Sequence, residues 1–287
     1  MWAAENWHDY TLLDCSDGER LEKWGDYTLV RPDPQVIWKH CKVHPTWKKA
    51  DAVYTRSKSG GGSWNQNRLP EEWRITYRDL TFSIKPMGFK HTGLFPEQAV
   101  NWDWFSALIK DAGRPIKVLN LFAYTGGATV AAAKAGASVC HVDASKGMVQ
   151  RAKENAALSG LSEAPIRYIV DDCFKFCERE LRRGNRYDAI IMDPPSYGRG
   201  PNGEKWMLED SIDAFITLAA KLLSDRPLFF LVNSYTTGLS PSAMGYILHR
   251  TLLPVYGGKV RSDEIGLPVL QTGAVLPCGS SSRWTAE

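Results

Sequence analysis

From about residue 115 onward, short apolar segments alternate with segments of helical character. Strands are predicted at 116–122, 137–143, 166–170, 187–192 and 227–233. Helices are predicted at 128–135, 145–159, 173–183, 209–224 and 241–250. The strands are too continuously apolar for a sheet with one face in water. This alternation therefore indicates a parallel sheet that helices cover on both faces.

The first 90 residues have a different character. Alternating apolar and polar residues predict short antiparallel strands at 26–30, 51–54 and 75–84. The segment 57–68 is rich in Gly and Ser and is interpreted as a loop.

We divide the chain into two parts on this basis. Residues 1–90 form a small β-rich domain, which we interpret as a substrate-recognition domain, and residues 91–287 form the α/β domain. A linking helix is expected near 98–110, and an antiparallel pair of strands around 273–277.

Several classes of protein are excluded by what the sequence lacks. No run of about 18 apolar residues is present, so we expect no membrane span. The N-terminus has no basic region followed by an apolar one, so we expect no secretion signal. The six cysteines show no paired CxxC spacing, and we therefore expect no metal and a reduced, cytoplasmic location.

A glycine pair follows the first strand of the α/β part, in the stretch FAYTGG. Gly126 and Gly127 permit a tight turn, and the next helix begins there with free N–H groups. The spacing is not G-x-G-x-x-G, so the dinucleotide fingerprint is absent in its strict form. No Walker lysine follows, which disfavours a triphosphate. Turn geometry alone also explains such a pair.

Acidic residues follow the next two strands. Asp143 stands about 20 residues after the glycine turn, where a carboxylate can accept hydrogen bonds from ribose hydroxyls. It also suits a helix cap, but Ser145 already supplies one. Asp172 is open to two interpretations, as a partner of an adenine amino group or as the N-cap of helix 173–183. Glycines and acids at successive strand ends predict a nucleoside-binding site.

The fourth strand ends in Asp193-Pro194-Pro195-Ser196-Tyr197. Methyl transfer needs a planar acceptor held in line with the donor, and alignment can supply on the order of 7–11 kcal/mol of the barrier. Two prolines fix φ and remove backbone donors, which leaves carbonyls to face an acceptor amine. Asp193 can accept a hydrogen bond from that amine, and Tyr197 can stack on the ring. A hydride-transfer enzyme needs no such arrangement, so a nicotinamide oxidoreductase is disfavoured.

These segments resemble the motifs of class I S-adenosylmethionine-dependent methyltransferases. The resemblance rests on Asn120–Gly127, Val142–Ser145, Glu154-Asn155, Asp172–Phe174 and Asp193–Tyr197. The segment TGLFPEQ at 92–98 also resembles a motif of one group within this class. That group contains the bacterial large-subunit ribosomal RNA cytosine-5 methyltransferases. The resemblance implies a Rossmann-like fold with a mostly parallel seven-stranded sheet.

The resemblance also implies roles for particular residues. The acceptor site would comprise Asp193, Pro194, Pro195 and Tyr197. S-adenosylmethionine would be held by Thr92, Gln98, Asn120, Phe122, Ala123, Tyr124, Thr125, Gly126, Gly127, Asp143, Ala144, Ser145, Asn155, Asp172, Cys173 and Phe174.

The sequence departs from that group after the fifth strand. Transfer to cytosine C5 requires a thiolate that adds to C6. Where the group has its cysteine, this chain has Tyr235 and Thr236. Cys278 remains the alternative, although a buried structural thiol is the simpler interpretation. We therefore expect transfer to a base nitrogen instead of C5.

The expected partner is RNA, which we expect to bind through the region Trp38–Arg68. It contains seven Lys or Arg and one acid, interleaved with tryptophans, which suits phosphates and stacked bases. A solvated basic face with core tryptophans is the alternative, and no PUA-type RNA-binding domain is visible. A small-molecule methyltransferase and a non-catalytic cofactor-binding interaction protein are the other functions considered, and the sequence leaves a homodimer open.

Overall fold

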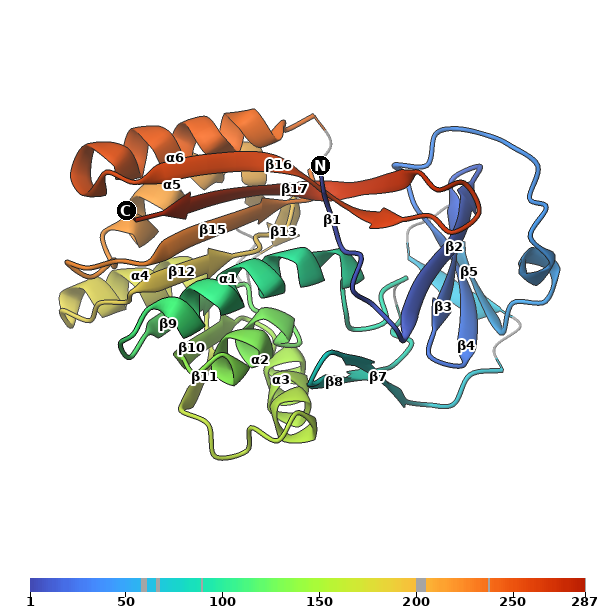
Figure 1. Ribbon diagram of the computed structural model, residues 1–287, viewed down its shortest axis with the longest axis horizontal. Coiled ribbons are helices and arrows are strands. Elements are labelled where there is room, and N and C mark those ends of the chain that lie inside the picture. Colours follow the sequence, from blue (N-terminus) through green and yellow to red (C-terminus); the bar gives the residue numbers. More distant parts are fainter. Residues whose placement is uncertain (58–60, 66–67, 89, 200–204, 237, 287) are drawn as a thin grey trace. The chain divides into compact units, whose positions relative to one another are not determined.

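The computed structural model describes residues 1–57, 61–65, 68–88, 90–199, 205–236 and 238–286 (Figure 1). The chain divides into two compact units. The first comprises Met1–Val100 and Ile265–Cys278, and the second comprises Asn101–Glu264 and Gly279–Glu287.

This division differs from the expected one at residue 90, because a C-terminal segment belongs to the first unit. In that segment Ile265 and Gly266 pair with the short strand β1 (Trp2–Ala3). The N–H of Leu270 also donates to the carbonyl of Leu12, at 2.9 Å. Such pairing between residues more than 250 positions apart leaves no signal in local sequence patterns.

The large sheet has the strand order β1-β16-β17-β15-β12-β9-β10-β11. Its remaining strands are β9 (Lys117–Leu121), β10 (Ser138–Asp143), β11 (Ile166–Val170), β12 (Ala189–Met192), β15 (Phe229–Ser234), β16 (Lys259–Pro268) and β17 (Val275–Thr285). Strands β15, β12, β9, β10 and β11 are parallel, and β17 is antiparallel to β15. The five predicted α/β strands are thus confirmed. The described residues give this sheet eight strands instead of seven, because β1 is added.

Six helices accompany this sheet in the described part of the chain. They are α1 (Ala99–Asp111), α2 (Gly127–Lys134), α3 (Lys146–Leu158), α4 (Cys173–Arg182), α5 (Leu208–Ala220) and α6 (Pro241–Tyr256). Ser145 caps α3 by accepting from the N–H of Met148, as predicted, and Ser240 caps α6 in the same way. None of the helices described is long and apolar enough to cross a bilayer.

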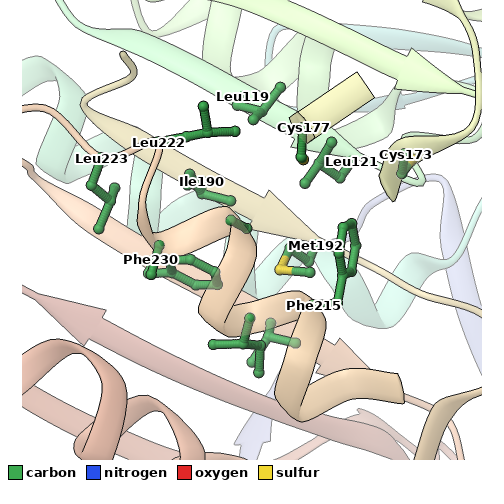
Figure 2. Packing of buried hydrophobic residues seen from close by; sticks show 14 of the residues in the cluster. Leu119, Leu121, Cys173, Cys177, Ile190, Met192, Phe215, Leu222, Leu223 and Phe230 are labelled. Atoms are coloured by element: carbon green, nitrogen blue, oxygen red, sulfur yellow. The ribbon is translucent and has the colours of Figure 1, made fainter. Parts of the chain in front are cut away.

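Successive residues of a strand point to opposite faces of the sheet, and both faces of the parallel strands carry apolar side chains. Helices therefore pack on both faces. On one face Leu119, Leu121, Ile190 and Met192 pack with Phe215 of α5 (Figure 2). The other face is covered by α1 and α2: the ring of Phe105 stacks on that of Phe229 at 5.9 Å. Both faces being dry explains why the strands have few polar residues.

The first unit contains two further sheets. One has the order β2-β3-β4-β5-β6, with β2 (Tyr10–Ser16), β3 (Glu19–Trp24), β4 (Tyr27–Pro32), β5 (Ala52–Arg56) and β6 (Gly62–Asn65). The other pairs β7 (Trp73–Tyr77) with β8 (Leu80–Ile84). Two expectations were wrong here: β4 and β5 are parallel, and Gly62–Asn65 form a strand where a loop was expected. Residues 58–60 and 66–67 of that loop lie outside the described residues.

A buried polar chain lies between the sheet and α2. The side-chain amide of Asn120 donates to Thr129 Oγ1 at 2.9 Å, and Thr129 Oγ1 lies 2.9 Å from His141 Nδ1. Thr129 Oγ1 can accept from Asn120 and still either donate to or accept from the neutral ring of His141, depending on its tautomer. Burial lowers the pKa of His141 to about 3, so the ring is neutral at physiological pH.

This neutral histidine makes stability depend on pH. The unfolded chain binds a proton at His141 below about pH 6.5, whereas the folded chain does not, so stability is complete above that pH and falls toward pH 3. Between pH 7 and pH 5 this group alone should lower the free energy of unfolding by about 2 kcal/mol. Replacing His141 by Asn keeps an acceptor for Thr129 and removes the titration.

Urea unfolding at pH 7, 6 and 5 measures the effect. His141→Asn should reduce the pH dependence of the free energy of unfolding only in part. The remainder comes from His91 in the first unit, because burial also lowers its pKa to about 3. The control is Thr217→Val on α5, which removes no titratable group and should leave the slope of unfolding free energy against pH unchanged. An equal slope in wild type and His141→Asn would contradict the prediction.

Candidate active site

The strand order places a topological switch between β9 and β12. After β9 the chain continues outward through β10 and β11, and then β12 returns to the opposite side of β9. In open α/β sheets ligands bind outside the carboxyl ends of the strands at such a switch. Here these two ends are held together, because the N–H of Asp193 donates to the carbonyl of Leu121 at 3.3 Å. The two principal motifs of the sequence thus meet at one edge.

The loop after β9, residues 122–126, has an unusual backbone. Phe122 and Tyr124 have φ values of 54° and 50°, and Gly126 has 83°. Only Asp17 and Arg78 share a left-handed φ among the other non-glycine residues described. Left-handed backbone at ordinary residues costs of order 1–3 kcal/mol each and clusters at binding sites. This backbone makes the loop, which we name the glycine loop, a candidate part of the binding site.

Three contacts compensate for the strain in the glycine loop. The N–H of Phe122 donates to Cys173 Sγ at 3.3 Å, and the N–H of Tyr124 donates to Asp143 Oδ2 at 2.8 Å. The side-chain amide of Asn155 donates to the carbonyl of Thr125 at 2.8 Å. Cys173 and Asn155 are both buried, so they support the loop from behind.

Gly126 is required for close packing as well as for its φ. A Cβ at this position would lie 2.8 Å from the Cβ of Ala152 on α3, and 3.2 Å from its Cα. Any side chain would therefore push the glycine loop away from α3. The sequence predicted a tight turn at this glycine. The structure adds that the close approach of α3 leaves no room for a side chain at Gly126.

Asp143 lies half-buried at the end of β10. Its Oδ1 accepts from the N–H of Ser145 and its Oδ2 from the N–H of Tyr124, both at 2.8 Å. Burial raises the pKa of Asp143 above its ordinary value, although these two N–H groups oppose the rise. Each carboxylate oxygen keeps acceptor capacity, so further donors such as ribose hydroxyls would be favourable here.

Asp172 is the N-cap of α4, where its side chain accepts from the N–H of Lys175 at 2.9 Å. The capping interpretation is therefore observed, and contact with an adenine stays a prediction. The neighbouring Phe174 is 41% exposed although its ring stacks on Phe215 at 5.7 Å. One face of an aromatic ring thus remains in solvent beside an exposed acid.

The remaining predicted cofactor residues fall into three groups. Gly127 begins α2, Ala123 is buried in the glycine loop and Ala144 is exposed beside Ser145. The side-chain amide of Asn120 faces α2, where it donates to Thr129 Oγ1. Thr92 and Gln98 are buried in the first unit, and their predicted role over the cofactor stays a prediction.

The Asp193–Tyr197 segment, which we name the acceptor corner, is held by its carbonyl groups. The carbonyl of Pro195 accepts from Trp206 Nε1 at 2.6 Å, and that of Ser196 accepts from the N–H of Leu208 at 3.1 Å. The Pro195 carbonyl is thus already engaged by Trp206, and contact of the proline carbonyls with an acceptor stays a prediction. Within the described chain the Pro194 carbonyl has no hydrogen-bond donor.

Trp206 is a site residue that sequence reasoning missed. It lies on β14 (Lys205–Met207), which pairs with β13 (Tyr197–Arg199), so that Tyr197 faces Met207. The ring of Trp206 lies 5.7 Å from that of Phe122 in the glycine loop. Trp206 thus contacts both the glycine loop and the acceptor corner. No sequence pattern around residue 206 indicates this role.

The site has the features that S-adenosylmethionine requires. Asp143 is a half-buried carboxylate with acceptor capacity that would suit ribose hydroxyls, and Phe174, two residues after Asp172, exposes part of its ring. Gly126 brings the first turn of α2, with its free N–H groups, close to the strand end. These residues fit the nucleoside of that cofactor.

Comparisons with known proteins agree with this geometry. The sequence model of a family of S-adenosylmethionine-dependent methyltransferases matches residues 50–212. A crystal structure of an S-adenosylmethionine-dependent methyltransferase from Agrobacterium tumefaciens has 39% sequence identity and a TM-score of 0.93, covering 99% of this chain and 93% of that chain.

Two curated relatives are similar over shorter stretches. A putative ribosomal RNA large subunit methyltransferase from Methanocaldococcus jannaschii is 32% identical, over 68% of this chain and 53% of that protein. Ribosomal RNA large subunit methyltransferase K/L from Shewanella frigidimarina is 38% identical, over 46% of this chain and 17% of that protein. The chain therefore spans about half or less of the length of these relatives.

Asp143→Ala should weaken binding of S-adenosylhomocysteine about 10- to 100-fold, because charge-assisted hydrogen bonds worth roughly 1.5–3 kcal/mol are lost. Isothermal titration calorimetry measures this directly. Asp111→Ala, at the exposed end of α1, is the control and should bind as wild type does. Unchanged affinity in Asp143→Ala would refute the ribose assignment.

The structural and sequence findings lead to one conclusion. The sheet has the topological switch of a Rossmann-like fold, and a strained glycine loop and a half-buried acid lie at its edge. The family match covers more than half of the 287 residues. The chain therefore belongs to the family of S-adenosylmethionine-dependent methyltransferases.

Proposed function

We propose that this enzyme methylates a base of ribosomal RNA, at a ring or exocyclic nitrogen. The observation that carries the proposal is the acceptor corner, where Asp193 stands at the end of β12 against the end of β9. When bound, S-adenosylmethionine supplies an electrophilic methyl group on a sulfonium. Asp193 accepts a hydrogen bond from the acceptor N–H and is placed to take the proton that the methylated nitrogen releases.

Nitrogen is favoured over C5 by the state of the cysteines. At the position where the cytosine-5 group carries its cysteine, this chain has Thr236, which donates a hydrogen bond to Ser196. Cys278 is buried, and burial raises the pKa of its thiol well above the ordinary value. Burial likewise raises the pKa of the Cys140, Cys173 and Cys177 thiols. Thiols held in this state are poor nucleophiles at neutral pH.

RNA is favoured by the two curated relatives, whose names assign them to ribosomal RNA of the large subunit. The basic region Trp38–Arg68 gives weaker support. Lys48 and Lys49 are exposed there, but Lys39 pairs with Asp17 at 2.9 Å and Lys42 pairs with Glu19. These exposed lysines suit contacts to phosphates.

The tryptophans of the basic region serve the first unit itself. The indole N–H of Trp47 donates to Asp14 at 2.8 Å, and Lys42 lies over its ring at 4.4 Å. The indole of Trp64 donates to the carbonyl of Met87 at 2.9 Å. Trp38 is the most exposed of the three, at 37%, but its indole N–H donates to the carbonyl of Cys15 at 3.0 Å, so all three are bonded within the first unit. We therefore assign this region to backbone phosphates and not to stacked bases.

Asp193→Ala should abolish methyl transfer and leave cofactor binding nearly intact, because Asp193 contacts the acceptor. Transfer is measured with tritiated-methyl S-adenosylmethionine and large-subunit ribosomal RNA transcribed in vitro, and binding is measured by calorimetry with S-adenosylhomocysteine. Asp225→Ala, an exposed residue before β15, is the control. Loss of cofactor binding in Asp193→Ala would show that the division between cofactor and acceptor residues is misplaced. Absence of transfer by the wild-type enzyme would overturn ribosomal RNA as the substrate.

A second experiment separates nitrogen from C5. The same transcript made with 5-fluorocytidine traps any enzyme that forms a covalent bond to C6, and the adduct migrates slowly on a denaturing gel. We expect no adduct, while the transcript with ordinary cytidine is methylated. A slowly migrating band that Cys278→Ser abolishes would establish C5 chemistry.

A further inference from the structure

Two hydroxyl groups meet beside the acceptor corner. Ser196 follows the two prolines after β12, and Thr236 follows β15, the parallel neighbour of β12. Thr236 Oγ1 donates to Ser196 Oγ at 2.8 Å. The contact joins residues 40 positions apart and lies entirely within the second unit.

The backbone holds both hydroxyls in place. The N–H of Thr236 donates to Ser234 Oγ at 3.1 Å, and the carbonyl of Ser196 accepts from the N–H of Leu208 at 3.1 Å. Tyr235 is packed against Gly279 of β17 so closely that a Cβ there would lie 2.9 Å from its ring. The two side chains are therefore positioned by three elements, β15, β17 and the start of α5.

The direction of this hydrogen bond leaves one proton to be placed. Because Ser196 Oγ accepts from Thr236, the Ser196 proton points elsewhere. Within the described part of the chain no acceptor for it is found, and the Ser196 side chain is only half-buried. A hydroxyl oriented by one neighbour, with its own donor directed outward, is suited to bind a ligand.

We propose that Ser196 donates a hydrogen bond to the methyl acceptor, and that Thr236 is the positioning residue that orients it. This inference rests on the proposed function. Asp193, three residues before Ser196, accepts from an N–H of the acceptor. The pair therefore selects a nucleobase edge on which an N–H stands beside a carbonyl oxygen or an unprotonated ring nitrogen. Thr236 then has a function of its own at the position where the cytosine-5 group carries its cysteine.

The alternative is that the contact merely ties the two loops together. Three substitutions separate the explanations: Ser196→Ala removes the proposed donor, Thr236→Val removes the orienting hydroxyl at similar volume, and Thr236→Ser restores it. The matched control is Thr217→Val on α5, which deletes a hydroxyl that bonds only the carbonyl of Asp213 in its own helix. Each protein is assayed with the ribosomal RNA transcript, with S-adenosylhomocysteine by calorimetry, and by thermal unfolding.

Ser196→Ala should lower kcat/KM for the RNA about 10-fold, and Thr236→Val about 3- to 10-fold, as expected for one hydrogen bond. Thr236→Ser should recover activity to within about 2-fold of wild type. Because Thr236 acts through Ser196, the double variant should be no worse than Ser196→Ala alone. Affinity for S-adenosylhomocysteine and the unfolding temperature should stay close to those of wild type.

Two results would overturn the inference while the proposed function stands. One is wild-type activity in Ser196→Ala. The other is a loss of kcat/KM in the double variant that equals the product of the losses in the two single variants. Equal losses of activity and of S-adenosylhomocysteine affinity would show a purely structural tie. Absence of transfer by the wild-type enzyme would instead remove the proposed function, and the inference with it.

Discussion

The site depends on the pairing of β12 with β9. This pairing makes β9 the point where the strand order reverses, and it brings Asp193 within 3.3 Å of the Leu121 carbonyl. The glycine loop and the acceptor corner leave the sheet from these two strand ends. Methyl transfer needs donor and acceptor in line, and alignment accounts for a large part of the rate. The pairing of these two central strands brings the glycine loop and the acceptor corner to one edge of the sheet, as the proposed reaction requires.

The surroundings of this edge stabilise loops that are unfavourable by themselves. Phe122 and Tyr124 adopt a left-handed backbone, and Cys173, Asp143 and Asn155 compensate from three different elements. Trp206 then joins the glycine loop to the acceptor corner through its ring and its N–H. Strain at a binding loop persists only where the surrounding structure holds it in several ways. Several residues that motif comparison assigns to the cofactor therefore act as supports behind the loop.

The differences between expectation and structure have physical causes. A local pattern predicts that Gly126 makes a tight turn, but it says nothing of Ala152, which lies 26 residues away and decides how much room exists. The Pro195 carbonyl was expected to face the acceptor, because the sequence does not show that Trp206 occupies it. Asn120 stands in the motif, yet its side chain points to α2, because alternate strand residues face opposite sides. In the first unit, the sequence did not show that β4 and β5 run parallel.

The sequence by itself determined the class of fold, the positions of the parallel strands and the motifs at their ends. These follow from hydrophobic period and turn residues, which act over fewer than about 20 neighbours. Only the tertiary structure decided which strand ends meet, which side chains support the glycine loop, and that the segment Ile265–Cys278 completes the first unit. It also decided that Thr236 reaches Ser196. Such contacts depend on strand order and packing between distant segments, and no local pattern specifies them.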